Sequence, residues 1–304
     1  MMRFQRTIKS SVSCQGIGLH TGKTTFLTLK PAPAGTGIVF IRMDLNNMHI
    51  RARGSNIATT GYATILSENG ASVKTVEHLL AAFAGLHIDN AIVEIDSEEV
   101  PIMDGSARSF VRLIADAGVQ TQEKIQPVLK ILKPLVVRDE DKQLAIWPAD
   151  MISISCCIHF HHPLLKEQSR RHEPNEESFL REISDARTFG FLQDFKTLQA
   201  NGLAKGASLD NTVVLDDYTI VNKEGLRSRD ECVRHKILDL IGDLSLIGMP
   251  IIGHVVAYKS GHCLNARMVN TVLNHPQNWI TLGLSKIDDF LYREKPLPQP
   301  AVVA

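Results

Sequence analysis

The amino-acid sequence predicts an α+β fold in which helices are layered against mainly antiparallel sheets. Three observations support this prediction. The chain of 304 residues is long enough for two domains of ordinary size, each with its own core. Each half shows strand-like runs first and then a helix, a strand and a helix. Strands and helices do not alternate regularly enough for a doubly wound parallel sheet.

In the first half, the spacing of apolar residues places the elements. Strands are expected at residues 24–29, 37–42 and 91–95, and helices at 73–86 and 107–117. In the second half, we expect strands at 128–137, 144–147 and 152–160, a helix at 177–186, an extended run at 212–215 and a long helix at 230–246.

A polar segment closed by Pro127 separates the halves and predicts a linker at residues 123–127. The two domains are therefore expected at residues 1–122 and 128–290. Residues 291–304 are rich in proline and carry little pattern, so we expect them to form a mobile tail.

The composition excludes some classes of function. The 33 basic and 33 acidic side chains cancel, which gives no support for a nucleic acid or an anionic membrane as partner. No run reaches the roughly 18 apolar residues of a transmembrane helix, and the first ten residues lack the apolar core of a signal peptide. The five cysteines form no C-x-x-C pair, as expected of reduced thiols. We expect a cytoplasmic monomer that acts on a small molecule.

The predicted helix at 230–246 carries a possible metal site. His235, Asp239 and Asp243 are spaced four residues apart, so they lie along one face of a helix. A histidine and an aspartate in this arrangement can hold one divalent metal, and the third residue can orient a neighbouring group. An ordinary amphipathic helix with a solvated polar face would show the same pattern, and such helices are far more common.

Two further segments offer site residues. Glu77 and His78 begin a helix that is otherwise apolar or small, so they either form local caps or face a polar cavity. His262 lies in a predicted glycine-containing loop after an apolar strand, a position common at sites but also common for solvated surface histidines.

Together these residues are consistent with a catalytic zinc site. His78, His235 and Asp239 would supply three ligands to Zn²⁺ and leave a position open, as catalytic sites do. Glu77 would act as general base and His262 as general acid, with Asp243 orienting His262. The reaction implied is hydrolysis of an amide or ester. A zinc peptidase and a closed structural zinc site are the alternatives, although the peptidase motif H-E-x-x-H is absent.

Several ordered motifs point to one family. They are the stretch at 16–22, Thr75-Val76-Glu77-His78-Leu79, Pro101-Ile102-Met103-Asp104-Gly105-Ser106, Ala186-Arg187-Thr188-Phe189-Gly190, Val233-Arg234-His235-Lys236-Ile237-Leu238-Asp239 and Lys259-Ser260-Gly261-His262. With these motifs the chain resembles the bacterial UDP-3-O-acyl-N-acetylglucosamine deacetylase family of lipid A synthesis, from residue 16 to about residue 266.

The resemblance implies two similar domains, each packing a pair of helices on a mainly antiparallel sheet, with the active site at their interface. It also implies removal of an N-acetyl group from an acylated UDP-amino sugar. It assigns zinc to the same three ligands, an oxyanion-binding role to Thr188 and substrate contact to Lys236. Phe189 and Phe160 are then expected to contact the sugar or uracil. Gly206 is expected to border a passage for the acyl chain.

Overall fold

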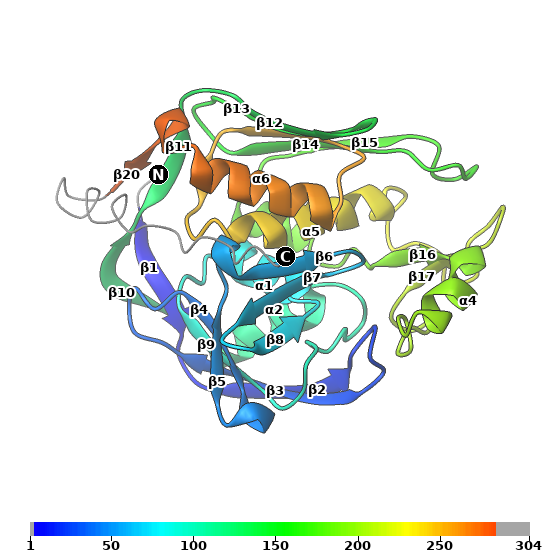
Figure 1. Ribbon diagram of the computed structural model, residues 1–304, viewed down its shortest axis with the longest axis horizontal. Coiled ribbons are helices and arrows are strands. Elements are labelled where there is room, and N and C mark those ends of the chain that lie inside the picture. Colours follow the sequence, from blue (N-terminus) through cyan, green and yellow to red (C-terminus); the bar gives the residue numbers. More distant parts are fainter. Residues whose placement is uncertain (1–2, 284–304) are drawn as a thin grey trace, which may run out of the picture.

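The computed structural model describes residues 3–283 as a sandwich of two sheets with helices between them. One five-stranded sheet, containing β12 to β15, lies at the top of Figure 1, and the other, containing β2 to β5, lies at the bottom. The helices α1, α2, α5 and α6 fill the space between the sheets. The predicted α+β class, with mainly antiparallel sheets, is confirmed.

The lower sheet has the order β2-β3-β9-β4-β5. Its strands are β2 (Val12–Ile17), β3 (Thr24–Pro31), β9 (Ala91–Ile95), β4 (Ile38–Arg42) and β5 (Met48–Arg51). Neighbouring strands are antiparallel except for β4 and β9, which are parallel. Inward-facing residues such as Leu27, Phe40 and Val93 are fully buried and form the core against the helices.

The upper sheet repeats this connectivity. Its order is β12-β13-β19-β14-β15, and only β14 and β19 are parallel. The strands are β12 (Leu135–Asp139), β13 (Lys142–Trp147), β19 (His254–Tyr258), β14 (Ser153–Ile158) and β15 (Gln168–His172). In both sheets the last strand in the chain inserts between the second and the third, so the fold is duplicated although the sequence repeat is too weak to detect.

Four small sheets complete the structure. They are β1 (Arg3–Ile8) with β10 (Val119–Gln126); β11 (Val128–Ile131) between β18 (Ile251–Ile252) and β20 (Trp279–Leu282); β6 (Ile57–Thr60), β7 (Thr64–Glu68) and β8 (Ala71–Lys74); and β16 (Phe189–Phe191) with β17 (Val213–Leu215). The last pair carries α4 (Leu192–Ala200) and projects at the right of Figure 1.

The central helices are α1 (Glu77–Gly85), α2 (Arg108–Ala117), α5 (Glu231–Ser245) and α6 (His262–Asn274), and α3 (Glu176–Glu182) is a shorter helix. Short 3-10 turns occur at Met43–Leu45, Gly54–Asn56 and Pro276–Asn278. Helices α1 and α5 pack directly on each other at Gly242. A Cβ at this position would lie 2.1 Å from the backbone oxygen of Glu77, so only glycine permits this approach. No helix within residues 3–283 is long and apolar enough to cross a membrane.

Several predicted elements differ from the structure. The helix predicted at 73–86 begins at Glu77, because residues 71–74 form β8 and Thr75 has a positive φ of 57° that a helix does not allow. The strand predicted at 128–137 is two strands in different sheets, separated by residues 132–134, the last of which is Pro134.

The remaining differences concern the connections and the C-terminal region. Residues 123–126 of the predicted linker belong to β10, and the domain boundary itself stays a prediction. His262 is the first residue of α6 and not part of a loop. The predicted mobile tail at 291–304 lies outside the described residues.

Candidate metal centre and active site

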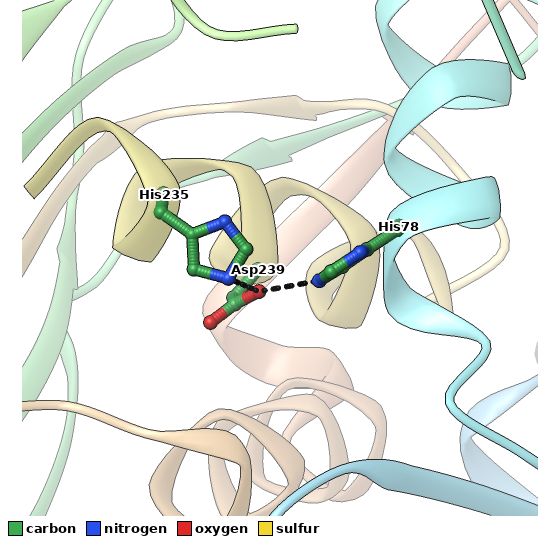
Figure 2. Close-up of side chains that lie close together, drawn as sticks. All are labelled: His78, His235 and Asp239. Carbon is green, nitrogen blue, oxygen red and sulfur yellow. Dashed lines mark ion pairs between the residues drawn. The ribbon is translucent and has the colours of Figure 1, made fainter. Parts of the chain in front are cut away.

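Three predicted ligands meet between α1 and α5. Figure 2 shows His78 from the start of α1 and His235 from α5 both directed at the carboxylate of Asp239. The Nε2 atoms of His78 and His235 lie 3.5 and 3.3 Å from Asp239 Oδ1. The potential ligand atoms of the three residues all lie within 4.8 Å of one another, and all three side chains are buried. These residues form the only such group of three or more found in the described part of the chain.

The protonation states of this cluster suit a cation. Burial, together with the neighbouring His78 and Lys236, lowers the pKa of His235 to about 3, so its imidazole is neutral and can ligate. Burial opposes the ionisation of Asp239, but His235 and Lys236 hold the pKa of this carboxyl well below its usual range. Asp239 Oδ1 is buried and has no hydrogen-bond partner among the described residues. An unsatisfied carboxylate oxygen facing two imidazole nitrogens fits a divalent metal.

A backbone carbonyl group fixes the orientation of the His235 ring. Its Nδ1 lies 3.0 Å from the backbone oxygen of Ala186, so the ring donates there and presents Nε2 to the cluster. The i to i+4 spacing on α5 then brings the Asp239 carboxylate to the same point.

Glu77 lies beside this cluster and is almost completely buried. Its Oε2 accepts a hydrogen bond from the backbone N–H of Thr64 at 3.0 Å, and its Oε1 lies 3.9 Å from Nε2 of His262. Burial raises the pKa of Glu77 above its usual range. A carboxylate with a raised pKa is suited to accept a proton near neutral pH.

His262 stands opposite Glu77 and is held by Asp243. Its Nδ1 lies 2.9 Å from Asp243 Oδ2, and its Nε2 lies 3.9 Å from Asp239 Oδ2. Burial alone would lower the pKa of His262, but the neighbouring carboxylates of Asp243 and Glu77 together have the larger effect and raise this pKa to about 9. His262 is therefore a cation at neutral pH and can donate a proton.

Asp243 is itself fixed by two further donors. The hydroxyl of Thr64 donates to its Oδ1 at 2.6 Å, and the amide of Asn265 donates to its Oδ2 at 2.9 Å. Neither Thr64 nor Asn265 was predicted from the sequence. Asn265 lies one helical turn after His262, which is a usable signal, but nothing in the sequence places Thr64 beside residues more than 175 positions later.

The family model for UDP-3-O-acyl N-acetylglycosamine deacetylase matches residues 5–274. The chain belongs to this deacetylase family. A deacetylase of this name from Syntrophus aciditrophicus is 47% identical over 289 residues, which is 95% of this chain and 92% of the relative. The relative from Myxococcus xanthus is 51% identical over 273 residues, covering 90% and 87% of the two chains. The relative from Geotalea uraniireducens is 48% identical and covers 93% of both.

Three further residues that the deacetylase family implies lie around one cavity of about 200 Å³. Thr188, Phe189 and Lys236 line this cavity together with Glu77, His262 and the three clustered ligands. Lys236 Nζ donates to Asp239 Oδ2 at 2.7 Å and lies 5.8 Å from the ring centre of Phe189. Burial disfavours its charge, but Asp239 raises the pKa of Lys236, so it remains an ammonium ion. The lining is completed by Leu19, Thr75 and Gly261, which lie in the motifs quoted above, and by Gly61 and Tyr62, which do not. None of these five was predicted as a site residue.

Two predicted substrate contacts lie outside this lining. Phe160 packs edge-to-face on Phe189, with ring centres 5.6 Å apart. Gly206 packs against the 16–22 stretch, where its backbone N–H donates to the backbone oxygen of Leu19. A Cβ on Gly206 would lie 2.2 Å from the backbone oxygen of Gly18, so the residue fixes the approach of these two segments.

Proposed function

We propose that this protein is a zinc-dependent hydrolase that removes the N-acetyl group from UDP-3-O-(3-hydroxyacyl)-N-acetylglucosamine. The products are the free amine and acetate, and the reaction belongs to lipid A biosynthesis. Family membership supports the substrate class. The observation that carries the chemistry is the pair formed by buried Glu77 and cationic His262 beside the His78, His235 and Asp239 cluster.

The three clustered residues would hold the metal, which supplies Lewis acidity that polarises a carbonyl and makes a nearby water acidic. Glu77 takes a proton from the attacking water, since its raised pKa makes it a base of suitable strength. His262 donates its Nε2 proton to the departing amine, because the Asp243 contact leaves that atom facing the cavity.

Thr188 would stabilise the negative charge that develops on the acetyl oxygen, and Lys236 would bind an anionic group of the substrate. The hydroxyl of Thr188 at the cavity wall is suited to donate to the oxyanion. The ammonium group of Lys236 is suited to the anionic part of a UDP sugar, and Phe189 with Phe160 behind it offers an aromatic surface to the sugar or uracil.

We propose that the segment containing Gly206, which is held against the 16–22 stretch, borders the passage by which the acyl chain leaves the cavity. We also propose that the protein acts in the cytoplasm as a monomer. The composition of the site supports a monomer, because the proposed ligands, base and acid all come from one chain.

The test is release of acetate from this substrate by purified protein, before and after chelation and with one equivalent of Zn²⁺ restored. Turnover should be lost with the chelator and should return with zinc. Glu77→Ala should bind zinc normally and lose turnover. If Glu77→Ala loses zinc and activity equally, Glu77 is not the base. A protein that binds zinc tightly but releases no acetate would reopen the peptidase and structural-site alternatives.

A further inference from the structure

A buried ion pair lies behind the metal cluster. Arg187 and Glu231 are 2% and 0% exposed. Arg187 Nε donates to Glu231 Oε1 at 2.9 Å, and Arg187 Nη2 donates to Glu231 Oε2 at 3.2 Å. Burying two charges removes their hydration, so a buried pair often adds little net stability compared with an apolar pair of the same size. The position of this pair therefore calls for an explanation beyond stability.

The Glu231 carboxylate also holds two separate backbone segments. The N–H of Arg187 donates to Oε1 at 3.0 Å, and the N–H of Arg227 donates to Oε2 at 2.6 Å. Glu231 lies in the first turn of α5, one turn before His235. The start of the helix that carries two clustered ligands is thus tied to the segment around Arg187.

That segment touches the site on both sides of Arg187. The preceding residue, Ala186, supplies the carbonyl oxygen that accepts from His235 Nδ1 at 3.0 Å. The following residue, Thr188, lines the cavity, and its N–H donates to the oxygen of Gly105 at 2.8 Å. One carboxylate therefore fixes the short stretch of backbone that orients His235 and places the Thr188 hydroxyl.

We propose that Glu231 and Arg187 are positioning residues for the metal centre, acting through the Ala186 carbonyl on His235 and through the backbone on Thr188. The inference deepens the proposed function and rests on it for the identity of the metal. Partners that orient a metal-binding histidine typically change metal affinity by about 10- to 100-fold when they are lost. A pair that only stabilised the fold would leave that affinity unchanged.

The test uses Glu231→Gln and Arg187→Lys in the full chain. Glu231→Gln keeps the shape of the side chain and removes its charge, whereas Arg187→Lys keeps the charge and removes the planar fork of donors. Three quantities are measured at 10 °C: the Kd for Zn²⁺ by competition with a chelator, the ¹⁵N NMR signals of the His235 ring, and kcat and KM for acetate release. Both variants should bind zinc about 10- to 100-fold more weakly. Both should show altered His235 signals, and kcat should fall with KM nearly unchanged.

Arg42→Lys is the matched control. Arg42 is also buried, at 6% exposed, and pairs with Asp44 at 2.7 Å, but it lies in the lower sheet and does not line the cavity. It should lose stability without a change in zinc affinity.

The proposal is overturned if Glu231→Gln and Arg187→Lys behave like the control, with lower stability but unchanged zinc Kd and unchanged His235 signals. It is also overturned if neither variant folds, since the pair would then support the fold as a whole. The zinc and NMR measurements do not depend on turnover. A wild-type protein that binds zinc but releases no acetate would therefore refute the proposed function while leaving this inference open to the same two measurements.

Discussion

Gly242 gives a sharp test of how closely α1 and α5 must pack. In Gly242→Ala the new Cβ would lie 2.1 Å from the backbone oxygen of Glu77 and 2.8 Å from its carbonyl carbon. Side-chain Cβ atoms essentially never approach other heavy atoms closer than 3.0 Å, so the helices must separate by about 0.9 Å or more. This movement displaces Glu77 and His78 relative to His235 and Asp239.

The effect on activity should exceed the effect on stability. Overpacking of this kind lowers the free energy of unfolding by roughly 1–3 kcal/mol, whereas replacing a helical glycine by alanine raises it by about 1 kcal/mol. The variant should therefore stay folded, because the stability of a typical domain is about 5–15 kcal/mol. A displacement of about 1 Å at a reacting centre can cost about 100-fold in rate, and we expect a loss of that order in kcat.

The assay combines acetate release, zinc affinity and urea unfolding. Gly190→Ala is the control, because a Cβ on Gly190 has no atom within 4 Å and this glycine has no positive φ. The control should retain wild-type kcat and stability. If Gly242→Ala keeps kcat and zinc affinity within about threefold of the wild-type protein, the helix contact does not set the geometry of the site.

Three further predictions concern protonation. Asp243→Asn replaces an acceptor by a group that can donate to His262, and it should lower kcat by about 10²- to 10⁴-fold with zinc still bound; near-normal turnover would remove Asp243 from the mechanism. Activity should fall above about pH 9, where His262 loses its proton, and this basic limb should be absent from the residual activity of His262→Gln. The ammonium groups of Lys23 and Lys74 lower the pKa of Glu98 from 4.5 to about 2, so its contribution to stability is complete above pH 4.5 and is lost as the pH falls toward 2. Acid unfolding of Glu98→Gln should depend less steeply on pH over this range, and an unchanged slope would contradict the assignment.

The sequence predicted the parts of the site that local spacing determines. His235, Asp239 and Asp243 share a helical face because α5 is regular. Glu77 and His78 were recognised because a charged pair at the start of an apolar helix needs a partner. The packing of α1 on α5 brings these residues together. Only the structure shows that Gly242 lies where the two helices touch.

Features that depend on tertiary contacts could not be predicted. Thr64 reaches Asp243 from a strand in the other half of the chain, and the carbonyl of Ala186 carries no side-chain signal at all. The start of α1 was misplaced because the apolar pattern of β8 continues into the helix, while the break at Thr75 is a backbone conformation. Two similar domains were expected from the resemblance, but the strand order within each sheet could not be predicted, because it is a property of pairing and not of local sequence.

The three clustered residues proposed to hold the metal come from distant parts of the chain, which has a consequence for biosynthesis. On the ribosome, His78 is made long before His235, Asp239 and His262, and α1 has its main packing partner, α5, only near the end of translation. A nascent first half therefore carries only one of the three clustered residues, so it cannot form the complete cluster. Its apolar helix α1 also lacks the cover that α5 provides. A chain that ends after its first half would therefore lack the complete cluster and would leave the face of α1 that packs on α5 open to proteases.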